Sequence, residues 1–366
     1  MYVRGVNLGN WLVLEKWMHP ALFGGTEAAD EYYLPGSLSR DAYEARILVH
    51  RSEYITERDF LRIKAMGLEA VRIPVPYFIF GDREPFIGCV KELDKAFNWA
   101  RRYGLKILID LHTAPYGQNG FDNGGICGVC KWCQKPEEVE FVLTVLERLA
   151  ERYGKRDELF GIEVLNEPVL EDMWIAADIS GRYPPVDAEM AAGSVGNSEA
   201  FIRQFYLDAY ERLRKFLPKE KYVVIHDAFH MKIWKDFMRE AVYENVILDT
   251  HLYLPGEVEG GQTVEAYEAF IQKWGEDIAE MQRYFPVICG EWCLSNPLAS
   301  ACEDPEEKKR IYNALGRAQL LAWKNGSGYF YWSYKLLMDM TGGEGWTGQD
   351  SWDLGRSMDF GWFVEE

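Results

Sequence analysis

Short apolar runs alternate with longer amphipathic segments along the whole chain. Apolar runs of about four to eight residues that are rich in β-branched side chains are typical of buried strands, whereas apolar residues three and four positions apart indicate helices. The short runs predict strands at Val3–Gly9, Glu69–Val75, Lys106–His112, Gly161–Asn166, Tyr222–Asp227, Val246–Tyr253, Pro286–Trp292 and Gly328–Lys335. The amphipathic segments predict helices at Thr56–Met66, Val90–Tyr103, Glu137–Tyr153, Ser198–Phe216, Val264–Tyr284 and Pro305–Lys324, with a weaker and shorter helix at Lys232–Tyr243.

Eight strands that alternate with helices predict an α/β fold, namely a (β/α)8 TIM barrel. No shift in composition marks a linker, so we expect residues 1–366 to form one catalytic domain. Long stretches follow strands one, four and eight, at Trp11–Ile55, Val169–Asn197 and Met340–Gly355. Because the loops after the strands build the active-site face of such a barrel, these stretches are expected to shape a substrate cleft.

The charge balance narrows the classes of partner. The chain has 40 basic and 58 acidic side chains and a formal net charge of −18, which repels nucleic acids and anionic lipids and suits a neutral substrate. Aromatic residues make up 14% of the chain, enough to supply rings that stack on sugars in addition to a core. We expect no nucleic-acid or membrane partner, and the oligomeric state stays open.

The chain shows no pattern of a targeting or membrane-spanning segment. No apolar run approaches the roughly 18 residues that a bilayer span needs. Strand-like sequence begins at Val3, where a signal peptide would need its apolar core. We therefore expect a cytoplasmic protein, or a secreted one if a leader has been removed.

Polar side chains gather at the carboxyl ends of the predicted strands, where barrel enzymes hold their catalytic groups. A single polar residue at a strand end is most often structural, but six strand ends at one rim are hard to explain in that way. The residues are Arg72 on strand two, Asp110 and His112 on strand three, Asn166 and Glu167 on strand four, His251 and Tyr253 on strand six, Glu291 on strand seven, and Tyr331 and Trp332 on strand eight.

Two carboxylates at this rim stand out, Glu167 and Glu291. An unpaired charge is costly in a core, and Pro168 ends the strand directly after Glu167 because proline offers no ladder donor. Strands four and seven lie across a barrel from each other, so the two side chains can meet. Retaining glycosidases need such a pair, one group as acid and one as nucleophile. A pair of unrelated surface acids is the alternative, but it does not explain why each ends an apolar run.

The order of these residues resembles glycoside hydrolase family 5. The motifs that carry the resemblance are Arg72, His112, Asn166-Glu167-Pro168, His251-x-Tyr253, Glu291 and Trp332. The segments that are similar to the exo-β-1,3-glucanase branch of that family are Arg4–Glu15, Val71–Pro74, Asp110–Pro115, Gln118–Asn123 and His226–Phe229. The resemblance spans nearly the whole chain up to about Trp332.

The resemblance implies a role for each matching residue. Glu167 would be the acid/base, with a raised pKa in the free enzyme, and Glu291 the nucleophile. Arg72 would keep Glu291 ionised, since a nearby cation lowers the pKa of a carboxyl. Tyr253 would orient the nucleophile, and Asn166 would bind the sugar 2-hydroxyl. His112 and His251 would line the first sugar site, and Trp332 would be the aromatic surface on which that sugar stacks. The hydroxyls of a terminal glucose would be bound by Glu15, Asp122 and Asn123.

The chain departs from that branch at two places. Phe121 matches one aromatic residue of the branch's entrance clamp, but the loop after Tyr253, where its partner would lie, reads Leu254-Pro255-Gly256. The segment beyond Trp332, which contains Trp346 and Trp352, is also unlike the family pattern. These differences leave the preference for the leaving group open.

Seven cysteines, an odd number, do not indicate a disulfide framework. The spacing of Cys127, Cys130 and Cys133 would suit zinc or a cluster, with Cys293 or Cys302 as a fourth ligand. No fourth ligand lies nearby in the sequence, and the usual pattern pairs two such units, so free thiols are the preferred interpretation. The glycosidase chemistry requires no metal and no cofactor.

We therefore expect a retaining exo-β-glucanase that removes terminal glucose and prefers β-1,3 linkages. An endo-acting β-1,4-glucanase is a second hypothesis, which Glu15 and the long loops oppose because they would block a through-running chain. A β-glucosidase for non-sugar aglycones is a third. A catalytically silent carbohydrate-binding barrel is a hypothesis of another class, but it predicts an eroded catalytic pair, whereas both glutamates and their supports are present.

Overall fold

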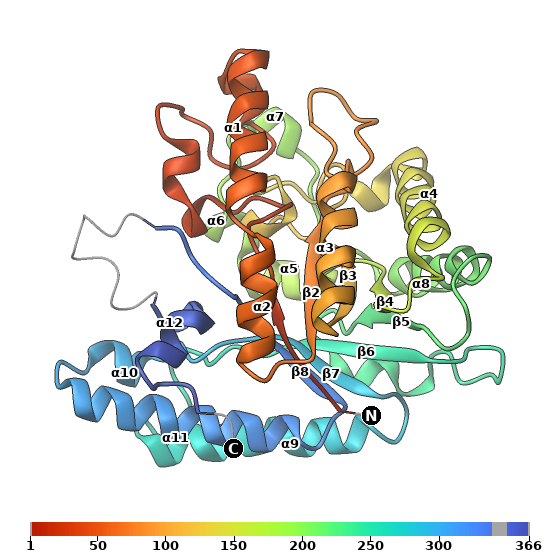
Figure 1. The fold of residues 1–366 in the computed structure, drawn as a ribbon. Coiled ribbons are helices and arrows are strands. Elements are labelled where there is room, and N and C mark those ends of the chain that lie inside the picture. Colours follow the sequence, from red (N-terminus) through yellow and green to blue (C-terminus); the bar gives the residue numbers. More distant parts are fainter. Residues whose placement is uncertain (1, 339–349, 365–366) are drawn as a thin grey trace.

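Eight parallel strands close into a barrel in the computed structural model, which describes residues 2–338 and 350–364 (Figure 1). The strands are β1 (Val3–Asn7), β2 (Ala70–Val75), β3 (Lys106–Leu111), β4 (Leu159–Glu163), β5 (Tyr222–His226), β6 (Val246–His251), β7 (Val287–Trp292) and β8 (Gly328–Tyr331). Each strand pairs with its neighbour in sequence, and β1 pairs with β8, so that Gly5 lies opposite both Ala70 and Phe330. The predicted (β/α)8 barrel is confirmed.

Helices follow the strands and cover the outside of the barrel; in Figure 1, α9 and α11 run side by side along its lower edge. The α-helices are α1 (Arg40–Glu53), α2 (Glu57–Ala65), α3 (Val90–Tyr103), α4 (Pro136–Tyr153), α5 (Glu171–Ala176), α6 (Ile179–Arg182), α7 (Ala188–Ala191), α8 (Glu199–Arg214), α9 (Val264–Met281), α10 (Pro297–Ala301), α11 (Pro305–Trp323) and α12 (Leu354–Asp359). Short 3-10 helices are η1 (Lys16–Met18), η2 (Pro20–Phe23), η3 (Pro35–Ser37), η4 (Asp122–Gly124), η5 (Trp132–Gln134), η6 (Met231–Asp236) and η7 (Asp350–Trp352).

Alternate residues along each strand point into the barrel, and they divide its interior into two parts. Toward the amino ends of the strands lies an apolar plug, made of Val3, Ala70, Leu108, Phe160, Val224, Ile247, Ile288 and Phe330. Toward the carboxyl ends lies a polar group that we call the Arg72 layer, made of Asn7, Arg72, Asp110, Glu163 and Asp249, all fully buried. On β2, β3 and β6, the polar residue stands two positions after the apolar one, which puts both on the inner face.

The ends of two strands differ from the prediction. β4 ends at Glu163, so Asn166 and Glu167 lie in the loop just beyond it. β8 ends at Tyr331, so Trp332 also follows its strand. Backbone hydrogen bonds to the neighbouring strands still hold these segments: the Asn166 amide donates to the Leu111 carbonyl at 2.9 Å, and the Trp332 amide donates to the Trp292 carbonyl at 2.8 Å.

The long loops contain structure that the sequence patterns did not indicate. The loop after β1 carries the 14-residue helix α1, and the loop after β4 carries α5 to α7. The predicted helix Lys232–Tyr243 is wrong, because Met231–Asp236 forms the 3-10 helix η6 instead. Most of the predicted loop Met340–Gly355, including Trp346, lies outside the described residues. Within the described residues, no helix is both long and apolar enough to cross a membrane.

Candidate active site

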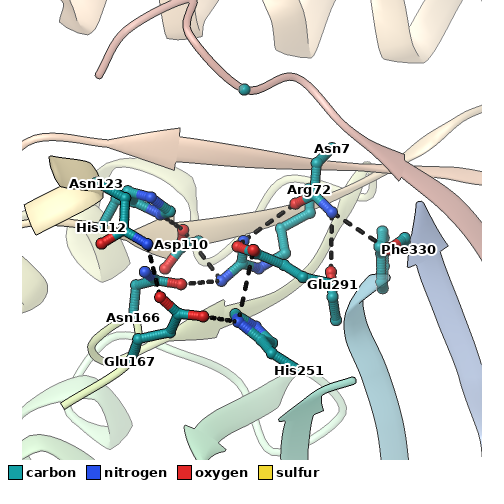
Figure 2. A network of polar contacts seen from close by, with 12 residues as sticks. Asn7, Arg72, Asp110, His112, Asn123, Asn166, Glu167, His251, Glu291 and Phe330 are labelled. Carbon is teal, nitrogen blue, oxygen red and sulfur yellow. Dashed lines mark hydrogen bonds and ion pairs between the residues drawn. The ribbon is translucent and has the colours of Figure 1, made fainter. Parts of the chain in front are cut away.

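Arg72 lies at the centre of the polar contacts at the carboxyl end of the barrel (Figure 2). Its Nε donates to Glu163 Oε2 at 2.7 Å. Its Nη1 donates to Asn7 Oδ1 at 3.0 Å and to Glu291 Oε1 at 2.9 Å, and its Nη2 donates to Asn166 Oδ1 at 2.8 Å. The planar guanidinium thus fixes a carboxylate and a carboxamide at the barrel mouth with donors that keep their protons.

Two further carboxylates, Asp110 and Asp249, approach the same guanidinium to 3.2 Å and 4.0 Å. Burial raises the pKa of Glu163 well above its usual range, more than the attraction of Arg72 lowers it. Glu163, Asp249 and His251 also bring ligand atoms within 4.8 Å of one another. Because the guanidinium of Arg72 contacts Glu163 and lies near Asp249, we interpret this group as an ion network around an internal cation.

Glu167 and Glu291 meet at a shared histidine. His251 Nδ1 lies 2.7 Å from Oε1 of Glu167 and 3.5 Å from Oε2 of Glu291, and all three residues are buried. Burial acts to lower the pKa of His251, but the attraction of Glu291, followed by the contacts with Asp249 and Glu167, outweighs it and raises the pKa well above its usual value. The two carboxyl groups therefore favour the protonated form of the ring.

The pKa shifts of the two glutamates are the reverse of the expectation from sequence. Burial acts to raise the pKa of Glu167, but the hydrogen bond and the charge of His251, followed by the hydrogen bond from Asn123, outweigh burial and lower it. For Glu291, burial outweighs the attraction of His251 and Arg72, and the pKa is raised. The expectation was wrong because it left out the charge of His251, which lies nearer to Glu167 than to Glu291.

Hydrogen bonds fix the directions of both carboxyl groups. Glu291 accepts from Arg72 on Oε1 and from the Tyr253 hydroxyl on Oε2, the latter at 2.8 Å. Glu167 accepts from Asn123 Nδ2 on Oε2 at 2.6 Å. The φ angle of Glu167 is 45°, a left-handed conformation that costs a non-glycine residue about 1–3 kcal/mol and is typical of functional sites.

Glu15 lies in the loop after β1 and is 4% exposed. Its Oε2 accepts from Trp17 Nε1 at 2.8 Å, whereas its Oε1 is buried without a hydrogen-bond partner. Burial and then the charge of Asp122 raise the pKa of Glu15 well above its usual range. A buried acceptor without a donor is costly, and a sugar hydroxyl is a group that would satisfy it.

Asn166 and His112 each leave one buried nitrogen unpaired. Asn166 Oδ1 is occupied by Arg72, and its Nδ2 has no partner. His112 Nδ1 lies 2.6 Å from Asp110 Oδ2, and its Nε2 has no partner. The His112 ring lies nearly parallel to that of Trp332, with centroids 5.7 Å apart. The barrel mouth thus presents unpaired polar atoms beside a buried indole, a combination suited to a sugar.

Phe121, expected to be one half of an aromatic clamp, has aromatic neighbours from other loops. Its ring centroid lies 5.3 Å from that of Tyr183, which follows β4, and 6.2 Å from that of Phe229, which follows β5. Residues 254–256, after β6, offer no ring. The aromatic surface near the rim is therefore built differently from the pattern that the resemblance implied.

Comparison with known proteins decides the family. The model of the cellulase family, described as glycosyl hydrolase family 5, matches residues 41–336. The chain belongs to glycosyl hydrolase family 5. The matched span contains Arg72, Glu167 and Glu291, whereas Glu15 precedes it and Trp352 follows it.

Curated relatives of this family 5 chain carry a consistent name. A probable glucan 1,3-β-glucosidase A from Emericella nidulans is 35% identical over 95% of this chain and 88% of its own length. A glucan 1,3-β-glucosidase from Blumeria graminis is 32% identical over 91% and 82%. Among solved structures, a rutinosidase from Aspergillus niger superposes with a TM-score of 0.75 at 21% identity, covering 99% of this chain and 98% of that one. The structural likeness shows the shared fold.

Sequence reasoning assigned no role to several residues that contact the groups of this family 5 site. They are Asn7, Trp17, Glu163, His226 and Asp249. Asp249 stands two positions before His251, as Asp110 does before His112, and alternate strand residues share a face, so strand parity was the signal that would have found it. His226 accepts from the Ala228 amide on Nδ1 at 3.0 Å, and its ring lies edge-on to that of His251, with centroids 4.5 Å apart.

The cysteines lie apart from this chemistry. All seven are free thiols. Cys127, Cys130 and Cys133 are not among the groups of three ligand atoms that lie within 4.8 Å of one another in residues 2–338 and 350–364. Burial raises the pKa of Cys130 above its usual value, which makes its thiol less reactive.

Proposed function

We propose that this family 5 protein is a retaining exo-β-glucanase that releases glucose from the non-reducing end of β-1,3-linked glucans. The observation that carries the proposal is the contact of both Glu167 and Glu291 with one nitrogen of His251. The relatives named glucan 1,3-β-glucosidases support the substrate class. The formal net charge of −18 suits a substrate without charge.

The separation of the two carboxyl groups supports retention of configuration. Retaining glycosidases hold their carboxyl groups about 5–5.5 Å apart, and inverting ones about 6.5–9.5 Å. Contacts of 2.7 Å and 3.5 Å to the same nitrogen keep the nearest oxygens of Glu167 and Glu291 below the inverting range. The reaction is then a double displacement, in which the sugar is bound covalently to the enzyme before water releases it.

In the first step, Glu291 attacks the anomeric carbon and Glu167 protonates the oxygen of the leaving group. The glycosidic bond breaks as the bond to Glu291 forms. Glu167 receives this proton from His251 Nδ1 across the 2.7 Å contact, since the neighbouring carboxyl groups favour the protonated form of the histidine. His251 and Glu167 therefore act together as the acid.

In the second step, Glu167 takes a proton from a water molecule, which attacks the anomeric carbon and frees Glu291. The donors of Arg72 and Tyr253 on the two oxygens of Glu291 stabilise it as the departing carboxylate. The free Nδ2 of Asn166 suits the 2-hydroxyl, where a hydrogen bond that strengthens in the transition state adds several kcal/mol.

A product experiment tests this mechanism. The purified protein is given laminari-oligosaccharides, and fresh products are followed by NMR before mutarotation. We expect β-glucose, released one unit at a time, and no turnover by Glu291→Gln. Substrates blocked at the non-reducing end should stay intact. Release of α-glucose would contradict retention, and internal cleavage of a blocked chain would contradict the exo mode.

The exo mode also depends on Glu15, whose unpaired Oε1 suits a hydroxyl of the terminal sugar. Without Glu15 that hydroxyl would be buried without an acceptor, which costs about 1–3 kcal/mol, so Glu15→Ala should reduce kcat/KM about five- to a hundredfold. Glu27→Ala is the matched control, because Glu27 is exposed in the same loop. Equal activities of the two variants would remove Glu15 from the binding site.

A β-glucosidase for non-sugar aglycones is the second candidate, and the surroundings of Phe121 favour it. Its ring neighbours are Tyr183 and Phe229, so the leaving-group side differs from the resemblance-based clamp. The ratio of kcat/KM for an aryl β-glucoside to that for laminaritriose separates the candidates. A ratio well above one after correction for leaving-group reactivity would favour the aglycone substrate.

A further inference from the structure

The segment Asp350–Asp359, which forms η7 and α12, packs onto the proposed sugar site although the family 5 match ends at residue 336. Its contribution is Trp352. The centroid of this indole lies 5.6 Å from that of Trp17 in an edge-on arrangement, and 5.1 Å from that of Tyr253 at an interplanar angle of 33°. The ring therefore bridges the loop after β1 and the loop after β6.

The backbone holds Trp352 firmly in this place. Ser333 donates its amide to the carbonyl of Trp352 at 2.7 Å, and its carbonyl accepts from the Leu354 amide at 2.9 Å. Asp353 accepts from the amide of Leu336 at 2.9 Å, and the Tyr331 hydroxyl donates to the Ser351 carbonyl. Each of these partners lies at the end of β8 or directly after it.

Both neighbours of Trp352 hold a carboxyl group of the site. Tyr253 donates its hydroxyl to Glu291 Oε2 at 2.8 Å. Trp17 donates its Nε1 to Glu15 Oε2, also at 2.8 Å. The indole of Trp352 thus packs on both residues that hydrogen-bond the proposed nucleophile Glu291 and the proposed sugar-binding acid Glu15. These two acids lie far apart in the sequence.

We propose that Trp352 is a positioning residue that keeps Tyr253 and Trp17 in the orientations that hold Glu291 and Glu15. The inference rests on the proposed function, because it gives those two acids their roles. Aromatic contacts of this kind stabilise an orientation by packing and by ring electrostatics. Without the indole, the rings of Tyr253 and Trp17 gain rotational freedom, and their hydrogen bonds are formed for less of the time.

The consequence for Glu291 can be measured as a pH profile. A hydrogen bond donated to a carboxylate favours the charged form, so weakening the Tyr253 contact should raise the pH at which the nucleophile ionises. The acid limb of kcat/KM should therefore move upward. A loss of general stability would reduce the amount of folded enzyme but would not move this limb.

The experiment compares Trp352→Leu and Trp352→Phe in the full chain with Trp362→Leu as matched control. Trp362 lies in the same C-terminal segment, but its ring packs on Tyr312 at 4.6 Å rather than on the site. We expect Trp352→Leu to lower kcat/KM for an aryl β-glucoside at least tenfold and to move the acid limb upward. Trp352→Phe should recover most of the activity, and Trp362→Leu should keep the wild-type profile.

The outcomes separate this inference from the proposed function. A wild type without turnover of any β-glucoside would overturn both. An active wild type whose Trp352→Leu variant stays within twofold, with an unmoved acid limb, would overturn the role of Trp352 alone. If Trp352→Leu does not fold, a double-mutant cycle of Trp352→Phe with Tyr253→Phe decides: coupled losses support positioning, and additive losses overturn it.

Discussion

The two ends of the barrel interior are built on the same strands and follow the same alternation, yet their chemistry is opposite. At the amino end, the apolar plug gathers only hydrophobic side chains. At the carboxyl end, the Arg72 layer sets one guanidinium among buried carboxylates. On β6 the change takes two residues, from Ile247 in the plug to Asp249 in the layer.

The difference shows how stability and activity are divided within one barrel. Burying apolar surface contributes roughly 25 cal/mol per Å², whereas a buried ion pair often does no better than a well-packed apolar pair. The Arg72 layer is therefore a poor choice for stability alone. Its donors instead reach Glu291 and Asn166 at the mouth, so the plug offsets the cost of a charged end that orients the proposed catalytic groups.

The largest expected effect is a loss of activity without a loss of fold at the charged end. Glu291→Gln keeps the shape of the side chain but removes the nucleophile. Turnover of an aryl β-glucoside should fall about 10⁴-fold or more, while the melting temperature in calorimetry stays close to that of the wild type, because Arg72 keeps Asp110 and Glu163 as partners. Activity within tenfold of the wild type would mean that another group attacks the anomeric carbon.

Arg72→Met should lower both activity and stability, because it leaves the carboxylates of the Arg72 layer without their cation. Removing one partner of a buried ion pair costs about 3–5 kcal/mol, which urea unfolding would measure, and activity per folded molecule should fall as well. The control is Arg40→Met. Arg40 forms an exposed pair with Glu84 at 3.2 Å, a kind of pair that contributes about 0–1 kcal/mol. Equal unfolding free energies of the two variants would show that the buried Arg72 layer matters no more for stability than an exposed ion pair.

The apolar plug should show the opposite behaviour. Ile288 lies on β7, three positions before Glu291, and Ile288→Ala leaves a cavity that should cost about 2–5 kcal/mol. The kcat of the folded fraction should stay within twofold at a temperature where the variant is folded. A marked fall in kcat together with unchanged urea unfolding would show that the plug serves catalysis directly.

The smallest effect concerns pH. The folded-state pKa of Glu163 is raised by burial, so the unfolded chain loses this proton first as pH rises. Its contribution to stability is fully present below the unfolded value of about 4.3 and declines above it by at most about 1.4 kcal/mol per pH unit. In Glu163→Gln, the unfolding free energy should therefore decrease less between pH 5 and pH 7 than it does in the wild type. Ile288→Ala should lower the unfolding free energy by the same amount at each pH. Parallel curves for wild type and Glu163→Gln would contradict the raised pKa.

The barrel could be predicted from sequence because its strands are fully buried and therefore apolar in short runs. Each of the eight predicted strands overlaps an observed one. Helix α1 was missed because it lies in a long loop and begins among charged residues, with Ser39 as its only clear start signal. The residues after Asp236 failed to continue a helix although their pattern suggested one.

The candidate site was predicted in part. Arg72, Glu167, His251 and Glu291 come together as their positions at strand ends implied. Local sequence patterns do not give the distances between loops. The direct contact of His251 with Glu167 could therefore not be predicted, and neither could the lowered pKa of Glu167 and the raised pKa of Glu291. For the same reason, Trp352 was noted only as unlike the family pattern.

The unpaired polar atoms of the site have a consequence for sugar selection. Glu15 Oε1, His112 Nε2 and Asn166 Nδ2 are buried without partners. The affinity for a ligand therefore depends on whether its hydroxyls form hydrogen bonds with these three atoms. A site built to hydrogen-bond a hydroxyl rejects an analogue without it by about 10⁴–10⁵-fold, far more than a pocket that only measures size. On this basis, a deoxy-glucoside of nearly identical shape would be refused more strictly than a bulkier sugar with every hydroxyl in place.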